Sequence, residues 1–361
     1  MKVGIVGLPN VGKSTLFNVL TKAGAASENY PFCTIEPNVG VVGVPDVRLE
    51  QISALVKPEN VVATSMNFVD IAGLVAGASK GEGLGNQFLA NIREATAIAH
   101  VVRCYEDENI IHVSGKVDPV ADCTTIETEL MLADLATVEK ALDKHKKVAR
   151  SGQKEAKSML AICEEFVDIL QDGKMLRLAE LSDESMALAK EMRLLTAKPM
   201  LYIANIADNG CYHNHVQALR DYVAVQSATN MVEVCASIES ELVELEEEEL
   251  EVFLADMGMS EPGLNRVIRA SYDLLDLGTF FTAGVKEVRA WTYKKGFNAA
   301  QAAGVIHSDF EKHFIRAEVV GYQDYIDSNG ESGAKQAGLW RLEGKDYLVK
   351  DGDVIYFRTS A

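Results

Sequence analysis

Short apolar runs and longer helical stretches alternate over the first 127 residues. Runs rich in valine and isoleucine stand at 2–6, 67–71 and 99–104, and a helical pattern follows the first of them at 12–22. Strands of a parallel sheet are buried on both faces, so they read as nearly continuous apolar runs. The pattern therefore predicts an α/β fold in which helices cover a parallel sheet.

The pattern becomes purely helical over 128–198. This segment lacks strand-like runs, and leucine and valine recur at three- and four-residue spacing over 132–142. Such spacing places apolar side chains on one face of a helix. We expect an inserted α-helical hairpin whose turn lies at Ser151-Gly152.

Strand character returns at 199–205, and an acidic helical region then runs to about 277. The insertion is therefore expected to split one α/β domain into 1–127 and 199–277. Beyond it, β-rich runs at 287–293, 314–321 and 346–357 surround a short helical pattern near 298–304. We expect a small mixed β domain over 278–361.

Composition narrows the class of protein. The 361 residues include 48% hydrophobic and 24% charged ones. No segment approaches the run of about 18 apolar residues that a membrane helix needs. Six cysteines are scattered without CxxC pairs, which argues against disulfide and zinc frameworks. We expect a globular cytoplasmic protein without a membrane span.

The net charge of −18 is distributed unevenly. Residues 199–277 hold 3 basic and 15 acidic side chains, whereas 140–157, around the hairpin turn, hold 7 basic and 2 acidic ones. The acidic region is typical of a solvated helix face. The basic cluster could contact phosphate backbones such as that of RNA.

The strongest chemical motif is Gly7-x-x-x-x-Gly12-Lys13-Ser14, between a predicted strand and a predicted helix. Glycines let backbone N–H groups surround phosphates, the helix N-terminus adds positive potential, and the lysine reaches the terminal phosphates. The Ser14 hydroxyl can bind Mg²⁺. We therefore expect nucleotide binding by Asn10, Val11, Gly12, Lys13, Ser14 and Thr15. Of these, Lys13 is also expected to take part in catalysis.

Two further elements are typical of a nucleotide-dependent switch. Thr34 lies at a suitable distance downstream of the P-loop to give Mg²⁺ a second hydroxyl. A DxxG motif at 70–73 ends a predicted strand. It can place Asp70 near the water shell of the metal and the Gly73 N–H on the terminal phosphate.

Leu74 stands where regulatory GTPases carry the glutamine that orients the attacking water. Leucine cannot hydrogen-bond water, so we expect slow hydrolysis or a water positioned by another residue. His112 is the candidate, because a neutral imidazole can accept a proton from water. A structural role for His112 is the alternative.

Recognition of the base is expected at Asn205-Ile206-Ala207-Asp208, which stands where GTPases have NKxD. The lysine that packs over the base is replaced by Ile206, whereas Asp208 could still accept hydrogen bonds from guanine. These residues alone do not decide whether the site prefers adenine or guanine. Cys235-Ala236-Ser237, after a predicted strand, is expected to close the base pocket with Ala236 and Ser237.

These motifs carry a resemblance that extends from end to end of the chain. The sequence resembles the YchF family, also called Obg-like ATPases, at GLPNVGKST (7–15), NYPFCTIEPN (29–38), DIAGLVAGASKGEGLGNQFL (70–89), NIAD (205–208) and the C-terminal block. The resemblance implies a P-loop G domain over 1–127 and 199–277, a coiled-coil helical domain over 128–198, and a TGS domain of ubiquitin-like β-grasp fold over 278–361.

The resemblance also implies ribosome binding and a preference for ATP over GTP. An apolar residue at Leu74 fits this class, whereas Asp208 departs from the glutamate that is common in the family. Asn10 resembles the residue that binds K⁺ in related potassium-stimulated NTPases. Mg²⁺ and K⁺ are therefore the cofactors to consider.

Two main functional hypotheses follow. In the first, the protein is a slow ATPase switch whose nucleotide state alters its grip on the ribosome. In the second, it is a GTP-binding module for RNA or protein, in which hydrolysis is incidental and basic residues at 140–157, Lys312 and Arg316 carry binding. The alternative for these basic side chains is that they are simply solvated and bind no partner. A metabolic kinase is a weaker third hypothesis, because Thr34, DxxG and NIAD indicate the switch class.

Overall fold

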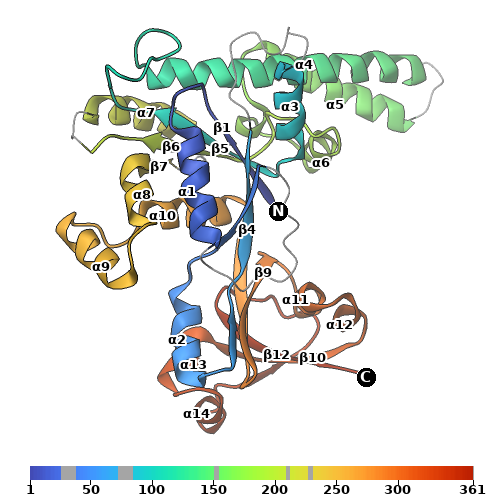
Figure 1. Ribbon diagram of the computed structural model, residues 1–361. Coiled ribbons are helices and arrows are strands. Elements are labelled where there is room, and N and C mark those ends of the chain that lie inside the picture. The colour runs from blue at the N-terminus through green and yellow to red at the C-terminus, as the bar shows by residue number, and fades with distance from the viewer. Residues whose placement is uncertain (26–37, 72–83, 150–153, 209–211, 227–230, 361) are drawn as a thin grey trace. The chain divides into compact units, whose positions relative to one another are not determined.

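The computed structural model describes residues 1–25, 38–71, 84–149, 154–208, 212–226 and 231–360 (Figure 1). These residues form two compact units, each with its own six-stranded sheet. The first unit is drawn from Met1–Ala23, Ile35–Gly40 and Asn67–Ser271, and the second from Gly24–Thr34, Val41–Met66 and Tyr272–Ala361.

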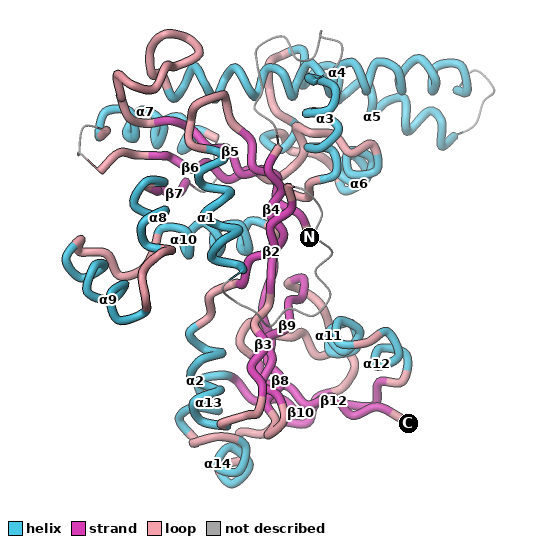
Figure 2. The backbone as a smooth tube through the Cα atoms, viewed as in Figure 1, coloured by secondary structure: helices cyan, strands magenta, loops and turns pink. Residues whose placement is uncertain are grey.

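The sheet of the first unit has the strand order β2-β4-β1-β5-β6-β7 (Figure 2). The pairings of β1 with β4 and β5, of β5 with β6 and of β6 with β7 are parallel. Every residue of β5 and β6 is buried, which explains their unbroken apolar sequence. The strands are β1 (Lys2–Val6), β2 (Val39–Gly43), β4 (Ser65–Asp70), β5 (Ala97–Arg103), β6 (Met200–Asn205) and β7 (Met231–Val234).

Helices join these parallel strands, as crossover connections require. The predicted α/β fold is therefore confirmed. The helices that follow the strands are α1 (Lys13–Ala25), α3 (Leu84–Glu94), α7 (His213–Val225), α8 (Ala236–Leu242), α9 (Glu247–Asp256) and α10 (Gly263–Leu274). The described helices include none with the length and apolar character that crossing a membrane would require.

The predicted helical insertion is also confirmed. Helices α4 (Pro119–Ala149) and α5 (Lys154–Gln171) lie side by side and are followed by the 3₁₀ turn η1 (Leu176–Leu178) and α6 (Asp183–Glu191) (Figure 1). Val138, Phe166 and Leu188 belong to the core that holds these helices together.

Helix α4 begins at Pro119, well before the expected boundary at residue 128. The Asp118 carboxylate accepts a hydrogen bond from the Ala121 N–H at 3.1 Å, and proline is favoured at the first helical position. The first turns of α4 bury Cys123, Ile126 and Leu130 within the first unit. The insertion is therefore continuous with the sheet unit at the base of α4.

A buried polar network lies beneath this base. Glu127 of α4 accepts hydrogen bonds from the hydroxyls of Tyr202 on β6 and Tyr222 on α7, the latter at 2.8 Å. Arg177 donates to Glu127 and to the Tyr202 hydroxyl at 3.4 and 3.1 Å. His100 of β5 lies opposite Tyr202, with 5.5 Å between the ring centroids. Burial, reinforced by Arg177 and opposed by Glu127, lowers the pKa of His100 to about 4.

The His100 imidazole predicts an acid-sensitive fold. Because its pKa is lower in the folded protein than its ordinary value of 6.5, the unfolded chain binds a proton that the folded chain excludes. The contribution of neutral His100 to the free energy of unfolding is complete above pH 6.5. It declines as the pH falls toward 4, by up to about 1.4 kcal/mol per pH unit. Urea unfolding followed by circular dichroism between pH 7.5 and 5 should show a smaller decline for His100→Phe than for the unmodified chain; equal slopes would contradict the assignment.

The sheet of the second unit has the order β11-β10-β12-β8-β9-β3 and mixes directions (Figure 2). Strands β8 and β12, and β3 and β9, pair in parallel, whereas the other pairings are antiparallel. The predicted mixed β domain is therefore confirmed. The strands are β3 (Asn60–Val62), β8 (Leu277–Ala283), β9 (Glu287–Lys294), β10 (Phe314–Gly321), β11 (Arg341–Glu343) and β12 (Asp353–Thr359).

Two apolar clusters stabilise the second unit. One includes Phe280, Val319 and Ile355 with α11, and the other includes Phe281, Val320 and Val354 with α2, α13 and α14. Strand β12 starts later than the β-rich run at 346–357 suggested, because Gly352 has a positive φ of 90° that turns the chain before Asp353. The helices are α2 (Val47–Val56), α11 (Ala299–Ile306), α12 (Ser308–Lys312), α13 (Tyr322–Asp327) and α14 (Glu331–Gln336).

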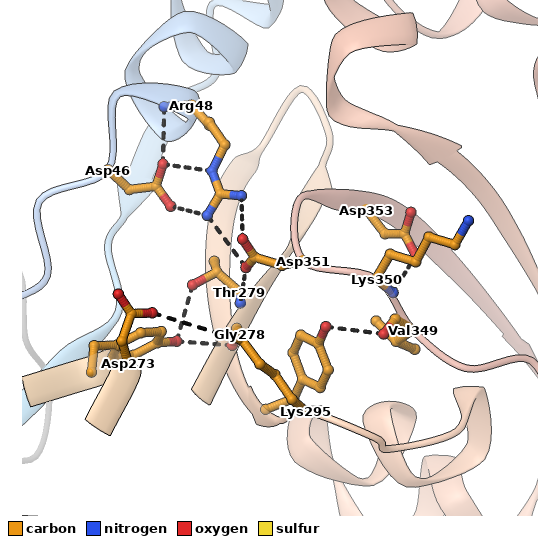
Figure 3. A network of polar contacts seen from close by, with 12 residues as sticks. Asp46, Arg48, Asp273, Gly278, Thr279, Lys295, Val349, Lys350, Asp351 and Asp353 are labelled. Carbon is orange, nitrogen blue, oxygen red and sulfur yellow. Dashed lines mark hydrogen bonds and ion pairs between the residues drawn. The ribbon is translucent and has the colours of Figure 1, made fainter. Parts of the chain in front are cut away.

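Residues 41–66 belong to this second unit, although the sequence placed them in the domain that begins at residue 1. Leu49 and Ile52 of α2 are part of its core, and β3 pairs with β9. Arg48 adds a polar link (Figure 3). Its guanidinium donates to Asp46 and to Asp351 at 2.8 Å each, and Asp351 accepts the Thr279 N–H at 2.7 Å. These long-range contacts were not visible in the local pattern.

Arg48→Gln should lower the free energy of unfolding of the second unit by roughly 2 kcal/mol, because two carboxylates lose charge-assisted hydrogen bonds. Both tryptophans of the chain, Trp291 and Trp340, lie in this unit, so tryptophan fluorescence during urea unfolding reports on it. Arg316→Gln, at an exposed position of the same unit, is the control and should change stability by less than about 0.5 kcal/mol. Equal effects of the two variants would refute a specific role for Arg48.

Candidate nucleotide-binding site

The P-loop connects the end of β1 at Val6 to the start of α1 at Lys13. Asn10 and Gly12 have positive φ angles of 63° and 89°. Such left-handed residues turn successive N–H groups toward one side, and the α1 N-terminus adds the positive end of its dipole. Ser14 and Thr15 are exposed on the first turn of α1. The loop therefore has the form of an anion-binding cradle.

Close packing explains both glycines of the motif. A Cβ atom on Gly7 would lie 2.8 Å from the Val101 carbonyl oxygen of β5. One on Gly12 would lie 2.2 Å from the Asn205 side-chain nitrogen, at a φ that L side chains rarely adopt. A side chain at either position would push the loop away from the ends of the strands.

Asn205, at the end of β6, bridges the P-loop and α8. Its amide nitrogen donates to the Val11 carbonyl at 2.9 Å, and its amide oxygen accepts the Ala236 N–H at 3.1 Å. The residue is 4% exposed. Sequence reasoning placed Asn205 among the groups that bind the nucleotide; the structure shows that its side chain holds two segments of the predicted site together.

The remaining residues of the predicted base site lie beside this bridge. The Ile206 N–H donates to the Val234 carbonyl of β7 at 2.9 Å, so the ends of β6 and β7 stay paired. Ile206 is half-buried, Asp208 is exposed, and the Ser237 hydroxyl is 3.1 Å from the Cys235 sulfur. Ligands of parallel α/β sheets bind at the carboxyl ends of the strands, where all these residues lie.

Lys13 forms an ion pair with Asp70, the last residue of β4. Their side chains are 8% and 19% exposed, so the charges are largely withdrawn from water. The strand register places Asp70 opposite Ile5, one strand away from the P-loop. The ammonium group of Lys13 is thus held at the same edge of the sheet as the phosphate cradle.

The donor set fits Mg²⁺, which prefers oxygen ligands and retains several waters. Ser14 offers an exposed hydroxyl at the start of α1, and Asp70 a carboxylate at the end of the neighbouring strand β4. The other two residues predicted at this place, Thr34 and Gly73, lie outside the described residues. For Asp70 to approach a metal, its ion pair with Lys13 must open.

His112 lies in the connection between β5 and α4, and its side chain is buried. Its Nε2 lies 2.9 Å from the Asp122 carboxylate, and its Nδ1 lies 2.8 Å from the Ser114 hydroxyl. Burial raises the pKa of Asp122, and the hydrogen bond from His112 opposes that rise. Both ring nitrogens are therefore engaged, as in the structural role that the sequence left open. For His112 to accept a proton from water, one of these contacts must open.

Asn10 has a protein partner as well. Its side-chain amide donates to the Ile111 carbonyl at 3.1 Å, while the side chain remains exposed. The P-loop is thereby tied to the connection that carries His112. Sequence reasoning did not identify Arg103, which ends β5 beneath this connection. Its only signal is a charged residue at the end of a run, 97–103, whose one other polar residue is His100.

The parallel sheet, the P-loop between β1 and α1, and the site at the strand ends define a P-loop nucleotide triphosphatase domain. Two family models match the chain. The model described as a 50S ribosome-binding GTPase covers residues 2–126, and the YchF-GTPase C-terminal model, described as a protein of unknown function (DUF933), covers residues 277–360.

Relatives match over nearly the whole length. "Ribosome-binding ATPase YchF" of Haemophilus influenzae is 59% identical over 358 residues, with 99% of this chain and 98% of the relative covered. The protein of the same name from Bacillus subtilis is 53% identical, with 99% of each chain covered. The structure of the Schizosaccharomyces pombe YchF GTPase has a TM-score of 0.89 at 36% identity, covering 99% of this chain and 97% of that one. The chain belongs to the YchF family.

Asn205→Ala should weaken nucleotide binding at least tenfold, or about 1.4 kcal/mol, because the Val11 carbonyl and the Ala236 N–H lose their shared partner. Titration of a fluorescent ATP analogue with Mg²⁺ measures the change. Asn18→Ala, at an exposed position of α1, is the control and should bind as the unmodified chain does. Unchanged affinity in Asn205→Ala would show that the bridge does not shape the site.

Proposed function

We propose that this protein is a slow, Mg²⁺-dependent ATPase that acts as a ribosome-associated switch. The proposal is carried by one observation: the Lys13–Asp70 pair stands at the phosphate cradle of a chain that matches relatives named ribosome-binding ATPase over its whole length. A kinase reaction has no comparable support, because these relatives and the matched family models carry the names of ATPases and GTPases.

Hydrolysis is proposed to use the residues around the cradle. Lys13 would leave Asp70 for the terminal phosphate, where its positive charge stabilises the charge that develops during transfer. Ser14, Thr34 and Asp70 would hold Mg²⁺, Gly73 would donate its N–H to the terminal phosphate, and His112 would position water. Leu74 supplies no hydrogen bond, which is the reason to expect slow turnover. A K⁺ ion at Asn10 remains a prediction.

ATP is the proposed nucleotide, although the names of similar proteins include both ATPase and GTPase. Ile206 lacks the long cationic stem that packs over guanine in NKxD, and its half-buried aliphatic side chain suits a base contact without charge. Asp208 is exposed and could still accept from guanine, so it does not by itself exclude GTP.

The ribosome is the proposed partner, and the cytoplasm the proposed location. The helical segment 128–198 would contact it through the basic cluster at 140–157. The C-terminal segment 278–361, proposed to be a TGS domain of β-grasp type, would contribute Lys312 and Arg316, both exposed. The G domain is proposed to comprise 1–127 and 199–277, apart from residues 41–66, which pack with the second unit.

Parallel titrations with fluorescent ATP and GTP in Mg²⁺ test the nucleotide. We expect ATP to bind at least tenfold more tightly, a difference of about 1.4 kcal/mol. Ile206→Lys should narrow that ratio, because it restores a stem over the base. Tighter binding of GTP to the unmodified chain would mean that Asp208 recognises guanine, and the ATPase assignment would be lost.

The same preparation tests the switch. Purified ribosomes should raise ATP turnover severalfold, and MgATP should change the affinity for ribosomes by a similar factor, because linkage is reciprocal. Salt-sensitive RNA binding that is indifferent to nucleotide would instead support a binding module with incidental hydrolysis.

A further inference from the structure

Arg103 is a buried cation with no carboxylate at ion-pair distance among the described residues, although its charge favours the ionised form of Asp122. It stands at the end of β5, is 1% exposed, and forms no ion pair within the part of the chain that the structure describes. Burial of a charge is costly unless hydrogen bonds compensate it. The hydrogen bonds that the Arg103 guanidinium makes must therefore compensate for its burial, and they show what the side chain holds.

Within the part of the chain that the structure describes, the hydrogen bonds of the Arg103 guanidinium all go to the connection between β5 and α4. The guanidinium donates to the carbonyls of Tyr105 and Ile110 at 3.0 Å each and to that of Asp107 at 3.3 Å. It also lies over the Tyr105 ring, 4.7 Å from the centroid. The connection from 105 to 110 is therefore wrapped around the planar fork of Arg103, which a single ammonium group could not reproduce.

Apolar burial contributes little to holding the connection 104–118 in place. Ile110, Ile111 and Val113 are 36%, 79% and 50% exposed, and of its aliphatic side chains only Val117 is half-buried. Polar contacts, those of Arg103 among them, therefore supply order that the packing of these side chains does not.

Three consecutive residues of the connection have partners on three different elements. The Ile110 carbonyl accepts from Arg103, the Ile111 carbonyl accepts from Asn10 of the P-loop, and His112 contacts Asp122 of α4. An ionised Asp122 requires a hydrogen on the His112 Nε2, which fixes the ring. The position of His112 relative to the P-loop is thus set by the residues that Arg103 holds.

We propose that Arg103 is the positioning residue for His112, and that it acts by holding residues 105–111 against the P-loop. This inference rests on the proposed ATPase function and adds a residue to it. Because its guanidinium donates to the connection, Arg103 is assigned no contact with the nucleotide; it places the residue that the proposed mechanism assigns to the attacking water.

The test compares Arg103→Lys with Arg177→Lys. Arg177 is the matched control: its side chain is 8% exposed in the same unit, and it bonds to Glu127 and Tyr202 outside the 105–112 connection. At saturating MgATP, Arg103→Lys should lower kcat at least tenfold with the Kd for ATP changed by less than about threefold, since the P-loop amides and Lys13 are retained. Arg177→Lys should leave kcat within twofold of the unmodified chain after correction for the folded fraction.

A double-variant cycle shows whether Arg103 acts through His112. In a His112→Ala background, Arg103→Lys should cause less than a twofold further loss of kcat, because the residue it positions is already absent. A full tenfold loss in that background, or a kcat within twofold of the unmodified chain for Arg103→Lys alone, would overturn the proposal.

Hydrogen exchange separates this inference from the proposed function. If the unmodified chain does not hydrolyse ATP, the function fails, yet Arg103→Lys should still accelerate amide exchange in 105–112 more than Arg177→Lys does. If Arg103→Lys does not fold, hydrogen exchange in the unmodified chain tests the inference instead. The Asn109 and Ile110 amides, which donate to Asp107 at 2.8 and 3.3 Å, should be protected by about 100-fold or more. Exchange at the rate of an unfolded chain would overturn the inference.

Discussion

The nucleotide site depends on one side chain that is satisfied on both sides. Asn205 ends β6, donates to the P-loop at Val11 and accepts from the first N–H of α8 at Ala236. A backbone cradle binds phosphate only if its N–H groups stay converged, and the left-handed turns at Asn10 and Gly12 have little reason to persist alone. The buried Asn205 amide stabilises these turns through its hydrogen bond to Val11, and the absence of a side chain on Gly12 leaves room for that amide.

Polar groups recur at the ends of the buried strands. Arg103 ends β5, Asn205 ends β6 and Asp70 ends β4, and each is paired within the first unit. In the protein interior, leaving such a polar group unpaired would cost several kcal/mol. Each of these side chains can therefore adopt few conformations. The site is therefore ordered by hydrogen-bond satisfaction, whereas the sheet behind it is held by apolar burial.

Helix α4 joins this site to the helical insertion. His112 meets it at Asp122, the tyrosines of β6 and α7 meet it at Glu127, and the backbone N–H groups of Leu195 and Thr196 meet it at Asp134. Three carboxylates along one helix are thus bound within the first unit. A change at the P-loop that moved His112 would act on the start of a long helix, which is a simple physical route from nucleotide state to the basic hairpin.

The sequence by itself determined the parallel sheet, the helical insertion, the mixed β domain and the P-loop, because these depend on local periodicity and on glycines at fixed spacing. It also indicated Asp70 and Asn205 at the strand ends, but not Arg103. Only the tertiary structure decided that Asn205 bridges two segments, that both nitrogens of His112 are engaged, that Arg103 holds a connection, and that residues 41–66 pack with the C-terminal sheet. Each of these rests on partners distant in sequence or on a loop geometry that periodicity does not encode, so no local pattern could specify which partner a side chain would meet.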